Sequence, residues 1–327
     1  MGMKHHYSLR KIAAALSCIF IASVTFAGTS LTANAAATSI TRISGNTRYE
    51  TMGMVSRAAF LSAPPSKAAV VASGTDFPDA LAASSLAGHL NAPILLTDPK
   101  SLSNETANEL NRLDANAIFV IGGNKAVSHN VENEIRATHP SATITRLTGS
   151  TRFDTAHSIY NELATLGAKP QTAIISTGFN FADALSISPY SYMQSAPFFL
   201  SSQSGLDEAS LNTLRNFQTA IIVGGEQAVP TSVEQQLKSI GVSTVRIQGT
   251  TRYETSLEIG KFTLNNLSLD PSSVVYATGA NFPDALSGSA LAGINKTVLL
   301  LAQNDSSPTI SASSMLLQRS TAYLVLL

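Results

Sequence analysis

Three arginines, Arg48, Arg152 and Arg252, are the residues of this sequence best suited to binding chemistry. Each directly follows a threonine and stands two residues before an acid, a pattern that predicts the first turn of a helix. The helix dipole disfavours a positive charge in that turn by roughly a few tenths of a kcal/mol. Because this cost recurs three times, each arginine is expected to have a compensating negative partner.

Two kinds of partner are open for these arginines. The first is an aspartate of the same repeat, in an internal salt bridge. The second is an anionic ligand, for which the planar guanidinium fork is well shaped. The two partners need not exclude each other. The candidate binding residues are therefore Arg48, Asp79, Arg152, Asp183, Arg252 and Asp284.

No catalytic motif accompanies these residues. The sequence has no His-Glu-x-x-His, Gly-x-Ser-x-Gly or Gly-x-x-x-x-Gly-Lys pattern. The histidines beyond the N-terminal segment occupy unrelated repeat positions, which favours solvated surface over a zinc site; they are His89, His129, His139 and His157. We therefore predict no catalytic residue, no metal site and no cofactor. Paired carboxylates stay open, because they meet only in the folded chain.

The arginines and aspartates belong to motifs that recur in register along the chain. The first motif, Arg-[Ile/Leu]-x-Gly-x-Thr-Arg-[Tyr/Phe]-[Glu/Asp]-Thr, occupies residues 42–51, 146–155 and 246–255. The second motif, Gly-x-[Asp/Asn]-Phe-[Pro/Ala]-Asp-Ala-Leu, occupies residues 74–81, 178–185 and 279–286. The third motif, Gly-Gly-x-x-Ala-Val, occupies residues 122–127 and 224–229. Their regular spacing indicates a threefold repeat of about 100 residues.

Between the motifs, short apolar runs alternate with longer amphipathic ones, which predicts an α/β fold with parallel strands covered by helices. In the first repeat we expect strands at residues 41–43, 69–72, 93–96 and 118–121, and helices at residues 48–60, 78–90, 104–113 and 129–138. Thr47 and Glu50, with their equivalents, are expected to form a capping box at a helix start. The second motif follows a strand and opens a helix, so it lies at the sheet edge where open α/β sheets usually bind ligands.

Repeat boundaries are placed between the motifs. We assign residues 36–140, 141–241 and 242–327 to the three repeats, the third of which is incomplete. Aligning Ala322 with Ala220 places Leu326 and Leu327 where a Gly-Gly pair is expected. Two explanations are open. Either the first strand of each repeat serves the preceding repeat, with strand 41–43 closing onto the third, or the chain is truncated.

Residues 1–35 are typical of a secretory signal peptide. Basic residues precede an uncharged apolar run over residues 12–26, and Ala33-Asn34-Ala35 offers a cleavage site; a retained membrane anchor is the alternative. Cleavage removes the single cysteine, Cys18, and three basic residues, which leaves 18 basic and 21 acidic residues and a net charge of −3. We therefore expect a secreted chain without disulfides and without bulk attraction to nucleic acid or to a membrane surface.

As a set, the motifs resemble the cell wall binding type 2 repeat of Gram-positive bacteria, over residues 42–327. The resemblance implies non-covalent anchoring through an anionic secondary wall polymer, such as a teichoic-acid-like glycan. It also implies three Toprim- or Rossmann-like α/β units in a pseudo-threefold arrangement within one monomer. In the family a Leu-rich strand is linked to polymer binding, and here it maps onto Leu95, Leu96, Phe199, Leu200, Leu300 and Leu301.

Three functions are compatible with this resemblance. The first is a non-catalytic protein held in the cell wall, which the lack of a covalent sorting motif favours because retention must then be non-covalent. The second is an N-acetylmuramoyl-L-alanine amidase or a modifier of one, because similar repeats accompany such enzymes. The third is an adhesin or a surface-layer component presented at the cell surface.

Overall fold

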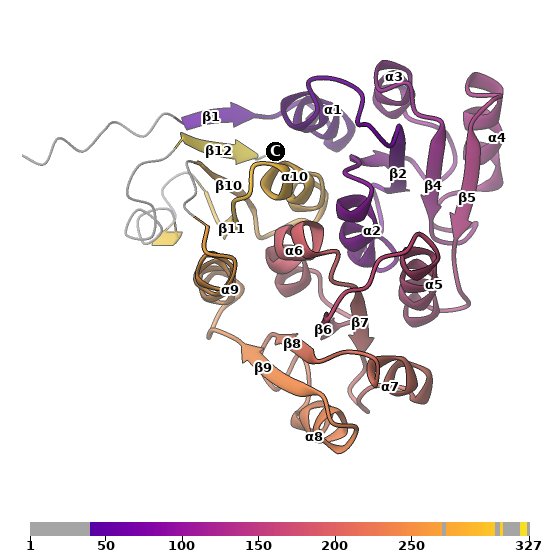
Figure 1. Ribbon diagram of the computed structural model, residues 1–327. Coiled ribbons are helices and arrows are strands. Elements are labelled where there is room, and N and C mark those ends of the chain that lie inside the picture. Colours follow the sequence, from indigo (N-terminus) through magenta and orange to yellow (C-terminus); the bar gives the residue numbers. More distant parts are fainter. Residues whose placement is uncertain (1–39, 270–272, 305–307, 310–320, 326–327) are drawn as a thin grey trace, which may run out of the picture. The chain divides into compact units, whose positions relative to one another are not determined.

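The computed structural model describes residues 40–269, 273–304, 308–309 and 321–325, and the expected signal segment, residues 1–35, lies outside them. The described strands form three sheets of four strands, and every strand pair in them is parallel (Figure 1). The predicted α/β class with parallel sheets is therefore confirmed. No helix in the described part of the chain is long and apolar enough to cross a membrane.

The elements expected in the first repeat all form. Its strands are β1 (Ile40–Ile43), β2 (Ala68–Ser73), β3 (Ile94–Thr97) and β4 (Ala117–Ile121). Its helices are α1 (Arg48–Ala59), α2 (Ala83–His89), α3 (Asn104–Arg112) and α4 (His129–Thr138). The helix expected at residues 78–90 differs in one respect, because it begins with a 3-10 turn, η1 (Ala80–Ala82).

The second and third repeats follow the same order of elements. The second contains β5 (Thr143–Leu147), α5 (Arg152–Thr165), β6 (Thr172–Thr177), α6 (Ala182–Gln194), β7 (Phe198–Ser201), α7 (Glu208–Leu214), β8 (Thr219–Val223) and α8 (Thr231–Ser239). The third contains β9 (Ser243–Ile247), α9 (Arg252–Asn266), β10 (Ser273–Thr278), α10 (Pro283–Ile294), β11 (Leu299–Ala302) and β12 (Thr321–Val325).

The first strand of each repeat completes the sheet of another repeat. The strand orders are β3-β2-β4-β5, β7-β6-β8-β9 and β1-β12-β10-β11. Thus β5 lies beside β4, β9 lies beside β8, and β1 at the start of the described chain lies beside β12 near its end (Figure 1). This confirms the hypothesis that first strands serve the preceding repeat and that the strand at residues 41–43 closes onto the third. Leu326 and Leu327 lie outside the described residues.

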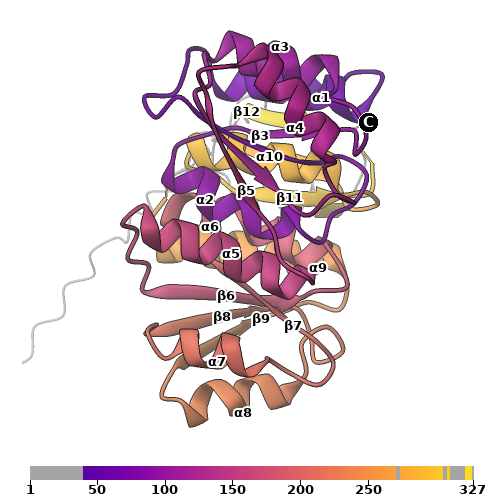
Figure 2. The ribbon, with the colours of Figure 1, turned by 90° about the vertical axis from the view of Figure 1, so that its right-hand side faces the viewer.

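The sheets are covered by helices because their central strands are apolar on both faces. All six residues of β2 are buried, and so are five of the six residues of β6 and of β10. A parallel strand with no exposed face needs a layer of helices on each side. One of these layers is shared between the repeats, because α2, α6 and α10 pack against one another (Figure 2).

Residues from all three repeats meet in this shared layer. The rings of Phe77, Phe181 and Phe282, one from each second motif, form a triangle with centroid separations of 5.5, 6.0 and 6.3 Å. At the other end of the layer, Tyr192 of α6 lies against Gly88 of α2 and Gly293 of α10. Equivalent side chains therefore meet each other, as a pseudo-threefold arrangement of the repeats requires.

The close approach at Gly88 yields a stability prediction. A Cβ atom at Gly88 would lie 1.9 Å from the backbone oxygen of Tyr192, so Gly88→Ala must separate α2 from α6. We expect it to lower the free energy of unfolding by about 2 kcal/mol, as overpacking in a core does. The measurement is thermal unfolding followed by circular dichroism.

Gly53→Ala is the matched control, because Gly53 is also a buried helical glycine but its Cβ would meet no atom closer than 3.7 Å. This variant should keep or raise the melting temperature, since alanine favours a helix more than glycine does. Equal losses in the two variants would contradict the packing described for α2 and α6.

Candidate functional site

Each first motif caps its helix as expected. The hydroxyls of Thr47, Thr151 and Thr251 accept hydrogen bonds from backbone amides three residues later, at 3.1 to 3.3 Å. Asp154 completes the box by accepting from the amide of Thr151, whereas Glu50 and Glu254, one methylene longer, reach the amide one residue earlier. The predicted capping box is therefore confirmed at Thr151 and Asp154, whereas at the other two helices the threonine cap forms and the glutamate accepts from the amide before the cap residue.

The arginine of each first motif reaches back to the second motif of its own repeat. Nη1 of Arg48, Arg152 and Arg252 donates to the carbonyl oxygen of the glycine that opens that motif, Gly74, Gly178 or Gly279, at 2.5 to 2.6 Å. No other hydrogen bond from these guanidinium groups is found within the described residues. Each half-buried arginine thus keeps most of its donors for other partners.

The second-motif aspartates of the first two repeats face the neighbouring repeat rather than their own. The charge of Arg152 and the hydroxyl of Thr155, both in the second repeat, act on Asp79. The charge of Arg252 in the third repeat acts on Asp183. The salt bridge within one repeat, one of the two alternatives that the sequence left open, is therefore replaced at these two aspartates by the arginine of the next repeat, because the first motif crosses from one sheet to the next. We call these meeting points the first junction (Asp79 and Arg152) and the second junction (Asp183 and Arg252).

The third pair of equivalent elements is α10, which carries Asp284, and α1, which begins at Arg48. These two helices pack against each other, and we call their meeting point the third junction. Asp284 is 1% exposed, whereas Asp79 and Asp183 are half-buried, so the third junction offers less carboxylate surface than the other two.

The Gly-Gly turn of the third motif lies directly against the aspartate at the first and second junctions. Gly122 and Gly224 have φ angles of +97° and +103°, which glycine adopts without strain. A Cβ atom at either position would also lie 2.7 or 2.6 Å from the Oδ2 atom of Asp79 or Asp183. Backbone conformation and space therefore both require glycine there.

The second junction encloses a cavity of about 580 Å³. The second motif contributes Asn180, Ala182 and Asp183 to its lining, the Gly-Gly turn contributes residues 225–228, and the next repeat contributes residues 249–252 and Thr255. The polar side chains around this space are three hydroxyls, two amides, the carboxylates of Asp183 and Glu226, and the guanidinium of Arg252. Within this lining, the guanidinium, the hydroxyls and the backbone amides can bind a group that carries negative charge.

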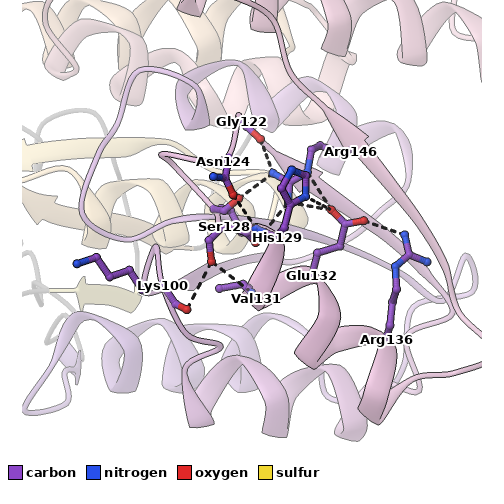
Figure 3. A network of polar contacts seen from close by, with 10 residues as sticks. Lys100, Gly122, Asn124, Ser128, His129, Val131, Glu132, Arg136 and Arg146 are labelled. Atoms are coloured by element: carbon purple, nitrogen blue, oxygen red, sulfur yellow. Dashed lines mark hydrogen bonds and ion pairs between the residues drawn. The ribbon is translucent and has the colours of Figure 1, made fainter.

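A further arginine, at the first position of the first motif, fastens the Gly-Gly turn (Figure 3). Nη1 of Arg146 donates to the carbonyl oxygens of Gly122 and Val127, and its Nε and Nη2 atoms contact Glu132 at 2.9 and 2.8 Å. Arg246 repeats this arrangement with Gly224, Val229 and Glu234. Our reading of the sequence missed this role, although the recurrence of arginine at position 42, 146 and 246 is the signal that could have revealed it.

Burial and ion pairing shift the pKa values of the acids near the junctions in opposite directions. Burial raises the pKa of Asp79 and of Asp183 above the ordinary value, against the opposing charges of Arg152 and Arg252. Burial also acts to raise the pKa of Glu132, but hydrogen bonds and charges from Arg136 and Arg146 together lower it. The junction aspartates are therefore costly to ionise, whereas Glu132 is held as an anion.

The Leu-rich strands lie in the core and not at the junction surface. Their six candidate residues are at most 2% exposed; they are Leu95, Leu96, Phe199, Leu200, Leu300 and Leu301. Side chains without accessible surface make no direct contact with a polymer. We therefore assign them to the packing of β3, β7 and β11 and do not include them in the candidate contact surface.

One serine and one histidine come together in the second repeat without forming a catalytic triad. His157 Nε2 lies 2.9 Å from Ser210 Oγ, and the same nitrogen lies 3.8 Å from Asp207 Oδ1. A triad needs the acid on the opposite ring nitrogen and an accessible nucleophile, and Ser210 is 1% exposed. Within the residues that the structure describes, no group of three or more His, Cys, Asp or Glu side chains could hold a metal ion.

The turn at the second junction can be tested with a pair of glycine variants. Gly224→Ala introduces both an unfavourable φ angle and a clash with Asp183, whereas Gly241→Ala, with φ +84° and no atom within 4 Å, introduces the backbone strain alone. We expect Gly241→Ala to lose about 1 kcal/mol of stability and Gly224→Ala clearly more. Thermal unfolding measures both, and equal losses would mean that Asp183 does not pack against the turn.

A second test uses the raised pKa of Asp183. Because the folded pKa exceeds the unfolded one, the ionised carboxylate costs stability at neutral pH, and this cost disappears as the pH falls through the folded pKa. Asp183→Asn should therefore raise the melting temperature at about pH 8, with a gain that fades by about pH 4.

Asp114→Asn is the control, because it should change the stability in the opposite direction. A hydrogen bond from Lys67 lowers the pKa of the exposed Asp114, so this substitution should slightly destabilise the protein at neutral pH. A loss of stability in Asp183→Asn at neutral pH would show that the ionised form of Asp183 is favoured, contrary to its burial.

Comparison with known proteins identifies the family of this chain. The family model described as cell wall binding domain 2 (CWB2) matches residues 42–132, 146–234 and 246–326. The chain is 30% identical to N-acetylmuramoyl-L-alanine amidase LytC of Bacillus subtilis, over 92% of this chain and 57% of that protein. It is 31% identical to the amidase enhancer of Bacillus subtilis, over 83% of this chain and 36% of that protein. The chain thus spans little more than half of the length of the first relative and about a third of the length of the second.

Two solved structures share the fold. Cwp6 from Clostridium difficile superimposes with a TM-score of 0.80 at 23% identity, over 88% of this chain and 46% of that one. Cwp8 from the same organism superimposes with a TM-score of 0.78 at 26% identity, over 88% of this chain and 49% of that one. Because the three family matches together cover most of the sequence, the chain belongs to the cell wall binding domain 2 family.

Proposed function

We propose that this protein is a non-catalytic wall-binding protein, exported and then held non-covalently by an anionic secondary polymer of the Gram-positive cell wall, such as a teichoic-acid-like glycan. The observation that carries the proposal is the state of the three junction arginines. Each is half-buried and placed by one hydrogen bond from Nη1 to a glycine carbonyl. The remaining donors of each guanidinium are available to an anionic ligand.

In the lining of the second junction, the donors that can receive an anionic group gather around Arg252, and the acids in the same lining are Asp183 and Glu226. Arg252 lies beside the backbone of the Gly-Gly turn and the hydroxyls of Thr251 and Thr255 in one cavity. Asp183 opposes an anion when it is ionised, but its burial makes the neutral form easier to reach than in an exposed aspartate.

A polymer is favoured over a small anion because the arginines recur. A repeating polyanion can engage several junctions of one molecule, so that modest affinities combine into firm retention. A net charge of −3 for residues 36–327 means that such binding depends on local arginine sites and not on a basic surface. The same charge disfavours nucleic acid as a partner, and one monomer already contains all three junctions.

The alternative function is wall hydrolysis or its modulation. The names of two relatives, an amidase and an amidase enhancer, favour it, but this chain covers only 57% and 36% of those proteins. In the described residues, the serine and histidine that meet at α5 and α7 lack the geometry of a hydrolase site. A clearing band in a peptidoglycan zymogram would favour this alternative over the binding protein.

The binding proposal predicts the effect of removing the three arginines together. The triple variant Arg48→Gln, Arg152→Gln and Arg252→Gln should bind purified walls at least about tenfold more weakly, because charge-assisted hydrogen bonds to the polymer are lost. The measurement is a pull-down with purified walls, before and after the secondary polymer is removed by acid. Unchanged helical circular dichroism would show that the loss does not come from unfolding.

A matched control removes the same charge elsewhere. Lys169, Arg215 and Lys238 are exposed and lie outside the junctions, so their triple replacement by Gln should leave wall binding near that of the wild type. Equal binding of the wild type to acid-stripped and untreated walls would contradict the polymer as the ligand. Equal losses in the two triple variants would point to net charge instead of the junctions.

A further inference from the structure

An exposed aromatic side chain distinguishes the second repeat from the other two. Phe179 is 58% exposed and occupies the variable position of the second motif, where the first and third repeats have Thr75 and Ala280. Burying a phenylalanine is favourable by about 2 kcal/mol, so an exposed ring at a ligand-facing sheet edge is available to a partner.

The ring is held in place on one side by its own repeat. The guanidinium carbon of Arg152 lies 5.5 Å from the centroid of the Phe179 ring. The ring of Phe153 packs edge-on at 6.2 Å, and the backbone amide of Phe179 donates to Thr177 Oγ1 at 3.2 Å. Phe179 is therefore a positioned platform next to a cation, and not a freely moving side chain.

Phe179 is adjacent to a residue of each of two junctions. Its partner Arg152 belongs to the first junction, where its charge acts on Asp79. The next residue, Asn180, lines the cavity of the second junction. The ring therefore lies next to groups that belong to both junctions.

An aromatic face beside a guanidinium matches one kind of chemical group. The face of the ring is negative and attracts the positive C–H edges of a saturated ring such as a sugar. The guanidinium attracts a carboxylate or phosphate attached to that sugar. A hydrophobic protein partner would find only one isolated ring here, which is too little for a docking patch.

We propose that Phe179 stacks on a sugar ring of the wall polymer while Arg152 binds an anionic substituent of the same or the adjacent sugar. This makes the second motif of the second repeat a sugar-binding subsite that the other repeats lack, because Thr75 and Ala280 have no ring. The inference rests on the proposed function and specifies its ligand as a glycan that bears negative charge.

The first test is a loss of affinity. Phe179→Ala should weaken binding to the acid-released, purified secondary polymer by about three- to tenfold, as expected for the loss of one ring contact. Leu61→Ala is the matched control, because Leu61 is 90% exposed and lies in the loop between α1 and β2. It should bind like the wild type. Isothermal titration measures both, and equal melting temperatures confirm that neither variant is unfolded.

The second test uses the absence of tryptophan from the sequence. Phe179→Trp creates a single-tryptophan protein whose emission should change when the purified polymer binds, whereas Leu61→Trp should give no response. Uncharged dextran is the comparison probe and should give no response with either variant. An equal response of Phe179→Trp to dextran and to the polymer would overturn the requirement for an anionic sugar.

The outcomes separate this proposal from the proposed function. Wild-type affinity in Phe179→Ala, together with a silent Phe179→Trp and weak binding by Arg152→Gln, would overturn the platform and leave the binding protein intact. Failure of the wild type to bind the polymer at all would overturn both.

Discussion

The structure depends on two arginines that fasten the first strands of the second and third repeats to the sheet of the preceding repeat. Arg146 and Arg246 each donate to both ends of a Gly-Gly turn and pair with a glutamate on the following helix. Without the guanidinium, two carbonyl oxygens and one largely buried carboxylate would lose their partners together, which is costly at low solvent exposure. The turn that these contacts hold is the one against which Asp79 and Asp183 pack. Strand crossing, turn and junction acid therefore form one connected arrangement.

Because the first motif crosses between sheets, every candidate site is composite. Its strand half lies in one sheet, and its helix half covers the next, so the arginine of one repeat meets the aspartate of the preceding repeat. An isolated repeat would carry half of two sites and no whole one. Three repeats in a line would make two junctions. The pairing of β1 with β12 and the packing of α1 on α10 bring the outer repeats together and supply a third.

Local structure was predictable from the sequence because its causes are local. Thr47 with Glu50 specifies a cap through contacts within four residues, and apolar runs specify strands such as β2 through their own composition. The partner of Asp79 was not predictable, because the choice between Arg48 and Arg152 depends on which sheet the strand before α5 enters. Burial of Leu95 could not be separated from a binding role, since an apolar strand serves either purpose until its neighbours are known. The same holds for His157 and Ser210, which lie 53 residues apart and meet only through folding.

The junction aspartates are less favourable for stability than the corresponding amides would be. An asparagine at Asp183 would have nearly the same shape and would avoid the cost of ionising a poorly solvated carboxylate. If this turn had a structural role alone, asparagine at position 183 would therefore give the more stable protein. Arg252 is placed instead by its hydrogen bond to the carbonyl oxygen of Gly279, and its positive charge partly offsets the burial of Asp183. A carboxylate that burial makes costly to ionise, in the same cavity lining as a guanidinium, is an arrangement that marks a candidate binding site more often than a packed core.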